Sequence, residues 1–154
     1  MKRLAGDRAI SDTTLEIPHP YEDGMAEQWI SSRTEQFALG KHISLAITLR
    51  ATGALIGTIG LGLRQEDDCG ELGYWIGVPY WNQGYCTEAA QALIRYAFDD
   101  LGMHRVFAEH MVRNPGSGRV MQKAGMTYEG TLRQHVRKWD KYEDLAVYGI
   151  LRSD

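Results

Sequence analysis

The chain has 154 residues, 44% of them hydrophobic and 24% charged, and this composition predicts one globular domain over residues 1–154 rather than a disordered chain. Seventeen Lys and Arg against twenty Asp and Glu give a formal charge of −3, which argues against a nucleic-acid or anionic-membrane binder. Two cysteines are too few for a disulfide framework, and neither a signal peptide nor a membrane-spanning apolar run is recognised. We therefore expect a cytoplasmic protein.

The first forty residues predict an irregular segment followed by a helix. Ile10–Pro20 contains two prolines and is expected to be extended or looped. Tyr21–Leu39 has helical spacing, and Gly40 is a natural stop. The inward-facing candidates of this helix are Met25, Trp29 and Phe37.

The period then changes to that of strands. Ile43–Leu49 and Leu55–Leu63 predict a hairpin joined by a turn at residues 50–53. Glu71–Val78 follows as a third antiparallel strand, which Pro79 should end because proline cannot donate to the ladder. The three strands together predict a meander.

The second half of the chain alternates helices with strands. Residues 89–101 place apolar side chains on one helical face, and a strand at Arg105–Val112 follows. The helical crossover predicts that this strand is parallel to the third one. A short helix at Ser117–Ala124 and two strands, Met126–Val136 and Asp144–Leu151, complete the order α-β-β-β-α-β-α-β-β. This order predicts an α/β (α+β) domain with a mixed central sheet of about six strands flanked by helices.

The segment between the third strand and the next helix carries the strongest chemical signal. Residues 81–88 contain a single glycine, Gly84, and mostly small or polar residues at the helix start. A helix N-terminus presents unpaired N–H groups and a partial positive charge, so this loop can cradle a pyrophosphate. A plain strand-to-helix turn is the alternative, because a single-glycine signal is weak. Neither GxxxxGK[ST] nor GxGxxG occurs, which disfavours a P-loop kinase and a Rossmann dehydrogenase.

Further segments extend this signal along the chain. They are Ile17–Tyr21, Glu71–Val78, Tyr80–Ala89, His104–Val106, Asn114–Met126 and Glu129–Arg133. Together they resemble the GNAT N-acetyltransferases, closest to the branch of ribosomal-protein N-terminal alanine and serine acetyltransferases (RimJ/RimL-like). The resemblance runs from about Ile10 to Leu151. Members of that family usually open with one more strand, but only Met1–Ala9 precede the matching segment, so either this chain lacks that strand or its start is truncated. A sheet without the strand exposes an edge, which favours pairing with another chain or some other covering; of these we expect a homodimer.

The resemblance implies transfer of an acetyl group from acetyl-CoA to a primary amine, by direct attack in a ternary complex and without a metal. The acceptor is a protein N-terminal amine or a small-molecule amine. A non-catalytic acyl-CoA-binding or regulatory module is the alternative. The residues implied for donor binding are Trp75, Ile76, Gly77 and Val78 for the pantetheine amide and the oxyanion, Gln83, Gly84, Tyr85, Cys86 and Thr87 for the pyrophosphate, and Asn114 and Arg119 for further CoA contacts.

The resemblance also implies two catalytic residues. Glu71 matches the acid proposed as general base in this branch, and strand alternation places it on the face opposite to Tyr74; an ordinary solvated acid at a strand end is the alternative. Ser117 matches a serine proposed to protonate the CoA thiolate, and it is also a good N-cap for the short helix that follows. Cys86 at a helix N-terminus would have a lowered thiol pKa, unless it is a buried inert cysteine. The acceptor-side candidates are Trp29, Tyr74 and His135.

Overall fold

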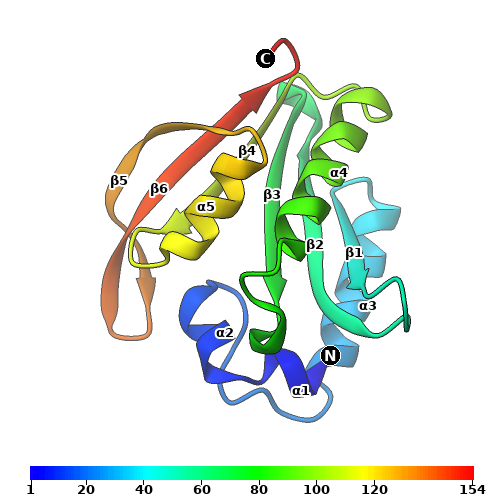
Figure 1. The fold of residues 1–154 in the computed structure, drawn as a ribbon, viewed down its shortest axis with the longest axis vertical. Helices are drawn as coiled ribbons and strands as arrows, with labels where there is room; N and C mark the ends of the chain where they lie inside the picture. The colour runs from blue at the N-terminus through cyan, green and yellow to red at the C-terminus, as the bar shows by residue number, and fades with distance from the viewer.

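A six-stranded sheet with helices on both faces forms the body of the protein, and the computed structural model describes all residues 1–154 (Figure 1). In chain order the elements are α1 (Lys2–Ala5), α2 (Arg8–Thr13), α3 (Met25–Ala38), β1 (His42–Thr48), β2 (Leu55–Arg64), η1 (Gln65–Asp67), β3 (Cys69–Ile76), η2 (Val78–Tyr80), α4 (Tyr85–Asp99), β4 (Arg105–Met111), α5 (Pro115–Lys123), β5 (Thr127–Lys138) and β6 (Lys141–Leu151). The mixed α/β class and the six-stranded sheet confirm the prediction from the sequence.

The strands lie in the order β1-β2-β3-β4-β6-β5. β1, β2 and β3 form an antiparallel meander, and β5 and β6 form a hairpin. β3 and β4 are parallel, as predicted, because α4 crosses over between them. Every residue of β4 pairs with β6, whereas β3 pairs with β4 only over Cys69–Glu71. Beyond Glu71 the two strands diverge, and Figure 1 shows α2 at the open end between them.

The main core lies between the sheet and helices α4 and α5. The apolar face of α4 is buried at helical spacing, through Ala90, Leu93, Ile94 and Ala97. It packs on strand residues such as Ile56, Leu61 and Val106, which are fully buried. Burial of one such leucine or isoleucine side chain contributes about 1.5–3 kcal/mol. This core fixes the position of the α4 N-terminus relative to β3.

A second, smaller core holds α1 and α2 on the opposite face of the sheet. It consists of Leu4, Ala5, Ile10, Tyr21 and Trp75. The Asp7 carboxylate caps α2 by accepting a hydrogen bond from the Ala9 N–H at 2.9 Å. The expectation of an extended segment from Ile10 onward is therefore wrong for the last turn of α2, because burial of Ile10 against Trp75 stabilises a short helix there.

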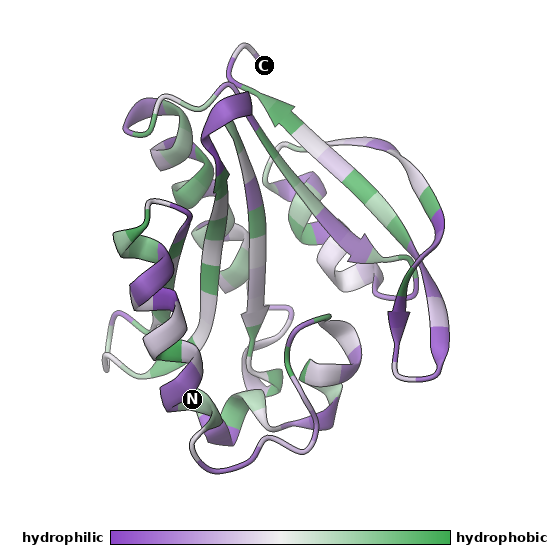
Figure 2. Cartoon of the chain, turned by 180° about the vertical axis from the view of Figure 1, so that it is seen from behind, coloured by the Kyte–Doolittle hydropathy of each residue, from purple (hydrophilic) through white to green (hydrophobic).

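Helix α3 lies on the face of the sheet opposite to α4 and packs on β1 (Figure 2). Met25 and Trp29 are half-buried, but Phe37 is 64% exposed and was wrongly expected to face inward. α3 packs on β1, the outermost strand on this side of the sheet, and Phe37 in its last turn points away from this contact to solvent. None of the helices is both long enough and apolar enough to cross a bilayer.

Candidate active site

The divergence of β3 and β4 opens a cavity of about 1120 Å³ that reaches both faces of the sheet. Its walls come from the end of α2, from β2 and β3, from the first turn of α4, and from the end of β4 with the start of α5. Glu71 and Trp75 line it from one face of β3, and Tyr74 lines it from the other. A molecule can therefore be held on one side of the sheet and react with a molecule on the other side.

The first turn of α4 points its amides at this cavity. Gly84 precedes the helix with a φ of +84°, a left-handed conformation that glycine adopts without a Cβ clash. The helical ladder begins with the Glu88 N–H donating to the Gly84 carbonyl at 3.0 Å, and no side chain caps the helix. The amides of Tyr85, Cys86 and Thr87 therefore have no partner within the helix, which suits them to bind an anion.

The backbone of β3 faces the opening only at every second residue. The Gly77 N–H donates to the Ile56 carbonyl of β2 at 2.8 Å, and antiparallel strands alternate bonded with non-bonded pairs. The backbone groups of Gly77 and Trp75 are therefore directed at β2, which corrects the expectation that both face the donor. Ile76 faces the opening, and its carbonyl accepts a hydrogen bond from the Trp81 indole at 2.7 Å. The Ile76 N–H is left directed at the cavity.

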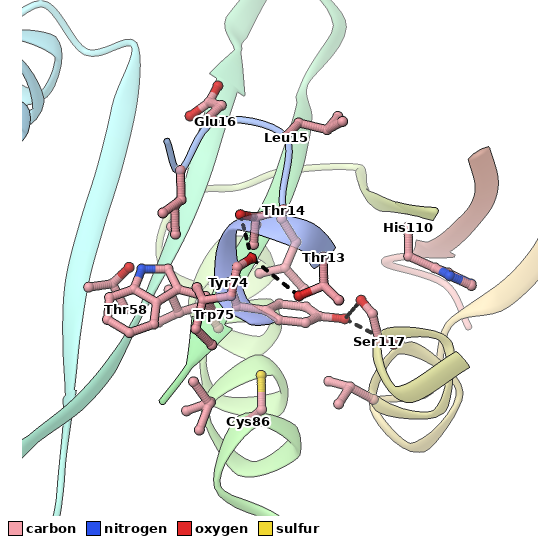
Figure 3. Close-up of a pocket in the computed structure, with 18 of the residues that line it drawn as sticks. Thr13, Thr14, Leu15, Glu16, Thr58, Tyr74, Trp75, Cys86, His110 and Ser117 are labelled. Carbon is pink, nitrogen blue, oxygen red and sulfur yellow. Dashed lines mark hydrogen bonds between the residues drawn. The ribbon is translucent and has the colours of Figure 1, made fainter. Parts of the chain in front are cut away.

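The start of α5 places Ser117 on the cavity wall. Asn114 caps this helix: its Oδ1 accepts a hydrogen bond from the Ser117 N–H at 3.4 Å, and Pro115 occupies the first helical position. The helix thus begins two residues earlier than predicted, and the expected capping role of Ser117 belongs to Asn114. The Ser117 hydroxyl instead lies 2.9 Å from the phenol oxygen of Tyr74 (Figure 3).

Three carboxylates line the opposite, α2 side of the cavity: Glu16, Glu71 and Glu109. Glu16 pairs with Arg33 at 3.0 Å, and Glu71 lies 3.5 Å from Arg64 with its side chain 49% exposed. Glu109 on β4 has no ionic partner. Burial raises the pKa of Glu109, and the negative charge of Glu71 raises it further. This side of the cavity suits a cationic group.

The family described as "Acetyltransferase (GNAT) domain" matches residues 2–127. The chain belongs to the GNAT acetyltransferase family. The probable N-acetyltransferase YjcK of Bacillus subtilis is 33% identical over 127 residues, which cover 81% of this chain and 70% of that protein. The uncharacterized N-acetyltransferase YnaD of the same organism is 34% identical over 108 residues, or 70% of this chain, and the match spans only 64% of YnaD. The ribosomal-protein-serine acetyltransferase of Escherichia coli is 32% identical over 95 residues, 61% of this chain and 53% of that protein.

Solved GNAT structures have the same fold. A GNAT-family acetyltransferase from Bacillus anthracis superposes with a TM-score of 0.88 at 23% identity, covering 100% of this chain and 88% of that one. The microcin C7 self-immunity acetyltransferase MccE, in complex with acetyl-CoA and AMP, has a TM-score of 0.88 at 18% identity, covering 97% and 84%. The relative named as a ribosomal-protein-serine acetyltransferase agrees with the resemblance to the RimJ/RimL-like branch noted from the sequence, and the solved structures share the GNAT fold.

Most of the residues predicted for this GNAT site line the one cavity. They are Glu71, Ser117, Trp75, Ile76, Gly84, Tyr85, Cys86, Thr87, Asn114, Arg119, Trp29 and Tyr74. Four others do not line it: Gly77, Val78, Gln83 and His135. The Gln83 amide is turned back to donate to the Pro79 carbonyl at 3.0 Å, and His135 is exposed on β5.

Tyr74 has a different environment from the one expected, whereas Cys86 has the buried environment that was one of its two predicted alternatives. Tyr74 points to the α4 and α5 side rather than to the acceptor side, as Figure 3 shows. Burial raises the pKa of the Cys86 thiol to about 12, which overrides the lowering expected at a helix N-terminus. Burial therefore favours the protonated form of the Cys86 thiol in the neutral range.

Several segments of the cavity wall were not predicted from the sequence. One is Thr13–Glu16, which begins at the last residue of α2 and overhangs the cavity (Figure 3). Another is Glu109–Met111 at the end of β4, and parts of β1 and β2 also line the cavity. Strand alternation could have found Glu109, because Phe107 pairs with Glu71 and the residue two positions later shares its face.

Proposed function

We propose that the protein transfers the acetyl group of acetyl-CoA to a primary amine by direct attack, without an acyl-enzyme. The observation that carries the proposal is the cavity between β3 and β4, which connects the free amides of the α4 N-terminus to a group of carboxylates across the sheet. An anionic, thioester-bearing donor fits the first end, and an amine fits the second. GNAT membership, with relatives named N-acetyltransferases, supports the same reaction.

In this proposal the first α4 turn holds the pyrophosphate, and the Ile76 N–H meets the carbonyl oxygen on which negative charge develops. The amine nitrogen attacks the thioester carbon, the C–S bond breaks, and its electron pair leaves with sulfur as a thiolate. Glu71 accepts the amine proton through water, and Ser117 donates a hydrogen bond to the departing sulfur. Arg119 and Asn114 lie at the same wall and complete donor binding.

We propose a cationic acceptor, either a protein N-terminal amine or a small-molecule amine. Glu109 supports this choice, because it is a carboxylate on the cavity wall without an ionic partner. The relative named as a ribosomal-protein-serine acetyltransferase favours the protein N-terminus. The site has no basic excess that would suit a nucleic acid, since the three Lys and Arg side chains on the cavity wall are matched by three Glu side chains.

The donor is tested first, by thermal melting with acetyl-CoA and with dephospho-CoA and ATP as controls. A ligand at about 100 times its dissociation constant stabilises the native state by about 2.7 kcal/mol. For a chain of this size that corresponds to a melting shift of roughly 5–10 °C. A shift of this size with acetyl-CoA supports the donor site, and its absence would contradict the proposal.

Turnover is then followed by thiol release with a panel of amines, in the wild type and in Glu71→Gln. General-base catalysis contributes about 10²–10⁴-fold, so we expect a loss of that order in kcat, with acetyl-CoA binding retained. Glu66→Gln is the matched control, because Glu66 is an exposed carboxylate on η1 outside the cavity. Acetyl-CoA binding without thiol release on any amine would identify a non-catalytic acyl-CoA-binding module instead.

We also propose a homodimer in a reducing, cytoplasmic setting. β1 is one of the two edge strands of the sheet, and Leu45 on it is 48% exposed. An open strand edge is a template for pairing with a second chain. Cys69 and Cys86 are both free thiols, which suits a reducing compartment. Light scattering on the purified protein tests the dimer, and a monomeric mass at all concentrations would exclude it.

A further inference from the structure

Tyr74 spans the gap between the diverging strands. Its phenol oxygen, from β3, lies 2.9 Å from Oγ and 3.1 Å from the carbonyl oxygen of Ser117 on α5 (Figure 3). The two residues are 43 positions apart in the chain. Their hydrogen bond connects β3 to α5 beyond Glu71, where β3 no longer pairs with β4. The Tyr74 hydroxyl is therefore in hydrogen-bond contact with the Ser117 side chain on the cavity wall.

The number of available protons limits how these two hydroxyls can be arranged. A phenol has one proton, and a carbonyl oxygen can only accept. If Tyr74 donates its proton to the Ser117 carbonyl, the Ser117 hydroxyl must donate to the phenol oxygen of Tyr74. The Ser117 proton is then engaged in this hydrogen bond and does not point into the cavity. If Tyr74 donates to Oγ, the Ser117 proton is free to point into the cavity. Only the second arrangement leaves Ser117 able to donate to a departing sulfur.

The surroundings keep Tyr74 in its donor form. Burial raises the pKa of Tyr74 well above its usual value, so the phenol stays protonated throughout the neutral range. Cys86, which also lines this part of the cavity, is protonated as well and brings no charge that would draw the phenol proton away. A thiolate forming in the cavity is the strongest acceptor available to the Ser117 proton, and this favours the second arrangement during the reaction.

We propose that Tyr74 is the positioning residue for Ser117: its hydroxyl donates to Oγ and so directs the Ser117 proton at the departing thiolate of CoA. The inference rests on the proposed acetyl transfer and adds to it a residue whose hydroxyl does not itself touch the substrate. Tyr74 keeps its proton throughout, and no bond is made or broken at the phenol.

The test is a double-mutant cycle in kcat with Tyr74→Phe, Ser117→Ala and the double variant. If Tyr74 acts through Ser117, Tyr74→Phe lowers kcat roughly tenfold in the wild-type background and less than twofold in the Ser117→Ala background. The KM for acetyl-CoA should stay within about twofold, because the phenylalanine ring keeps the packing against α4. A merely structural role of Tyr74 would give the same loss in both backgrounds.

Tyr148→Phe is the matched control. Its phenol oxygen is buried on β6 and accepts a hydrogen bond at 3.1 Å from Gln122, on the same helix α5 as Ser117. Tyr148→Phe and Tyr74→Phe therefore both remove one tyrosine hydroxyl bonded to α5, and their melting temperatures should fall by similar amounts. We expect kcat of Tyr148→Phe to stay within about twofold of the wild type.

The possible failures are distinguishable. If the wild type binds acetyl-CoA but releases no thiol with any amine, the proposed function fails, and the inference fails with it. If the wild type turns over and Tyr74→Phe lowers kcat equally with and without Ser117, or not at all, the inference alone is overturned. Loss of the same size in Tyr148→Phe would also overturn it, by assigning the effect to the stability of α5.

Discussion

Two glycines that face each other on the cavity floor allow the acceptor side to be tested against the fold. Gly73 on β3 and Gly60 on β2 are direct partners in the antiparallel ladder, and both line the cavity. A Cβ atom at Gly73 would meet nothing within 4 Å. A Cβ atom at Gly60 would lie 2.6 Å from Cε1 of His42 and 2.9 Å from the Ile43 carbonyl oxygen. Gly73→Ala and Gly60→Ala are therefore the same chemical change in opposite steric surroundings.

The magnitudes follow from these distances. Alanine in a strand restricts the unfolded chain, so Gly73→Ala should raise the free energy of unfolding by about 0.4–1 kcal/mol. Gly60→Ala restricts the unfolded chain to the same extent, but its methyl group must displace His42 and a backbone oxygen. Overpacking of this kind lowers the free energy of unfolding by about 1–3 kcal/mol. Because 1 kcal/mol shifts the melting temperature of a chain this size by about 2–4 °C, the two variants should melt roughly 5 °C apart, with Gly73→Ala the more stable.

The functional effects should also differ. The Gly73 methyl group would stand in open space on the acceptor side, so KM for the amine should rise, and more for Gly73→Val than for Gly73→Ala. KM for acetyl-CoA should be unchanged, because the first turn of α4 lies on the other side of the sheet. Thiol release at varied amine and fixed acetyl-CoA measures both constants. Equal melting temperatures for the two alanine variants would refute the steric argument, and an unchanged amine KM in Gly73→Val would refute the placement of the acceptor.

Two further predictions concern charge. The pKa of Glu109 is raised by burial and by Glu71, so the folded state binds this proton more tightly than the unfolded state, and stability falls as the pH rises from the ordinary value of 4.5 through the raised one. Glu109→Gln should therefore melt higher than the wild type at pH 7, with the difference vanishing near pH 4; the same difference at both pH values would exclude this cause. Arg113 donates to the Asp12 carbonyl at 2.7 Å and to the Glu143 carboxylate at 2.7 Å, which ties α2 to β6. Arg113→Lys cannot make both contacts and should cost about 1–2 kcal/mol, seen as faster amide exchange in α2, whereas unchanged exchange would show that α2 is held by its apolar core alone.

The meander of β1, β2 and β3 and the parallel pairing of β3 with β4 were predictable, because each local signal there agrees with the global fold. The place of β6 between β4 and β5 was not predicted. The hairpin turn at residues 50–53, the apolar face of α4 and the parallel crossover to β4 are all readable at short range. Helix α2 was not predictable in this way, although Asp7 is a good N-cap. A helix of six residues is not stable by itself, and this one depends on the burial of Ile10 against Trp75, which lies far along the chain. The prediction for Phe37 was wrong for the opposite reason: the residue has helical spacing, but its side chain stays exposed at the end of a helix that packs only on the outermost strand.

The sequence predicted which face of a strand or which end of a helix several site residues occupy, but not the contacts between their side chains. Alternation correctly separates Glu71 from Tyr74, and the glycine before α4 correctly indicates an N-terminus with free amides. The contact between Tyr74 and Ser117 was out of reach, since it depends on how far β3 and β4 diverge. Capping preferences fit Asn114 as well as Ser117, and the choice of Ser117 neglected Pro115, which is favoured at the first helical position and so indicates Asn114 as the N-cap.

The same divergence links the stability of this fold to its function. Where β3 leaves β4, backbone groups that a continuous sheet would pair are exposed, and an unpaired buried polar group costs about 1–3 kcal/mol. The Trp81 indole satisfies the Ile76 carbonyl, and the Tyr74 phenol bridges to α5. The Ile76 N–H is left without a partner from β4, facing a cavity large enough to admit a ligand. A substrate carbonyl placed there would complete the interrupted ladder, so binding gains the hydrogen bond that the fold gives up by opening the sheet.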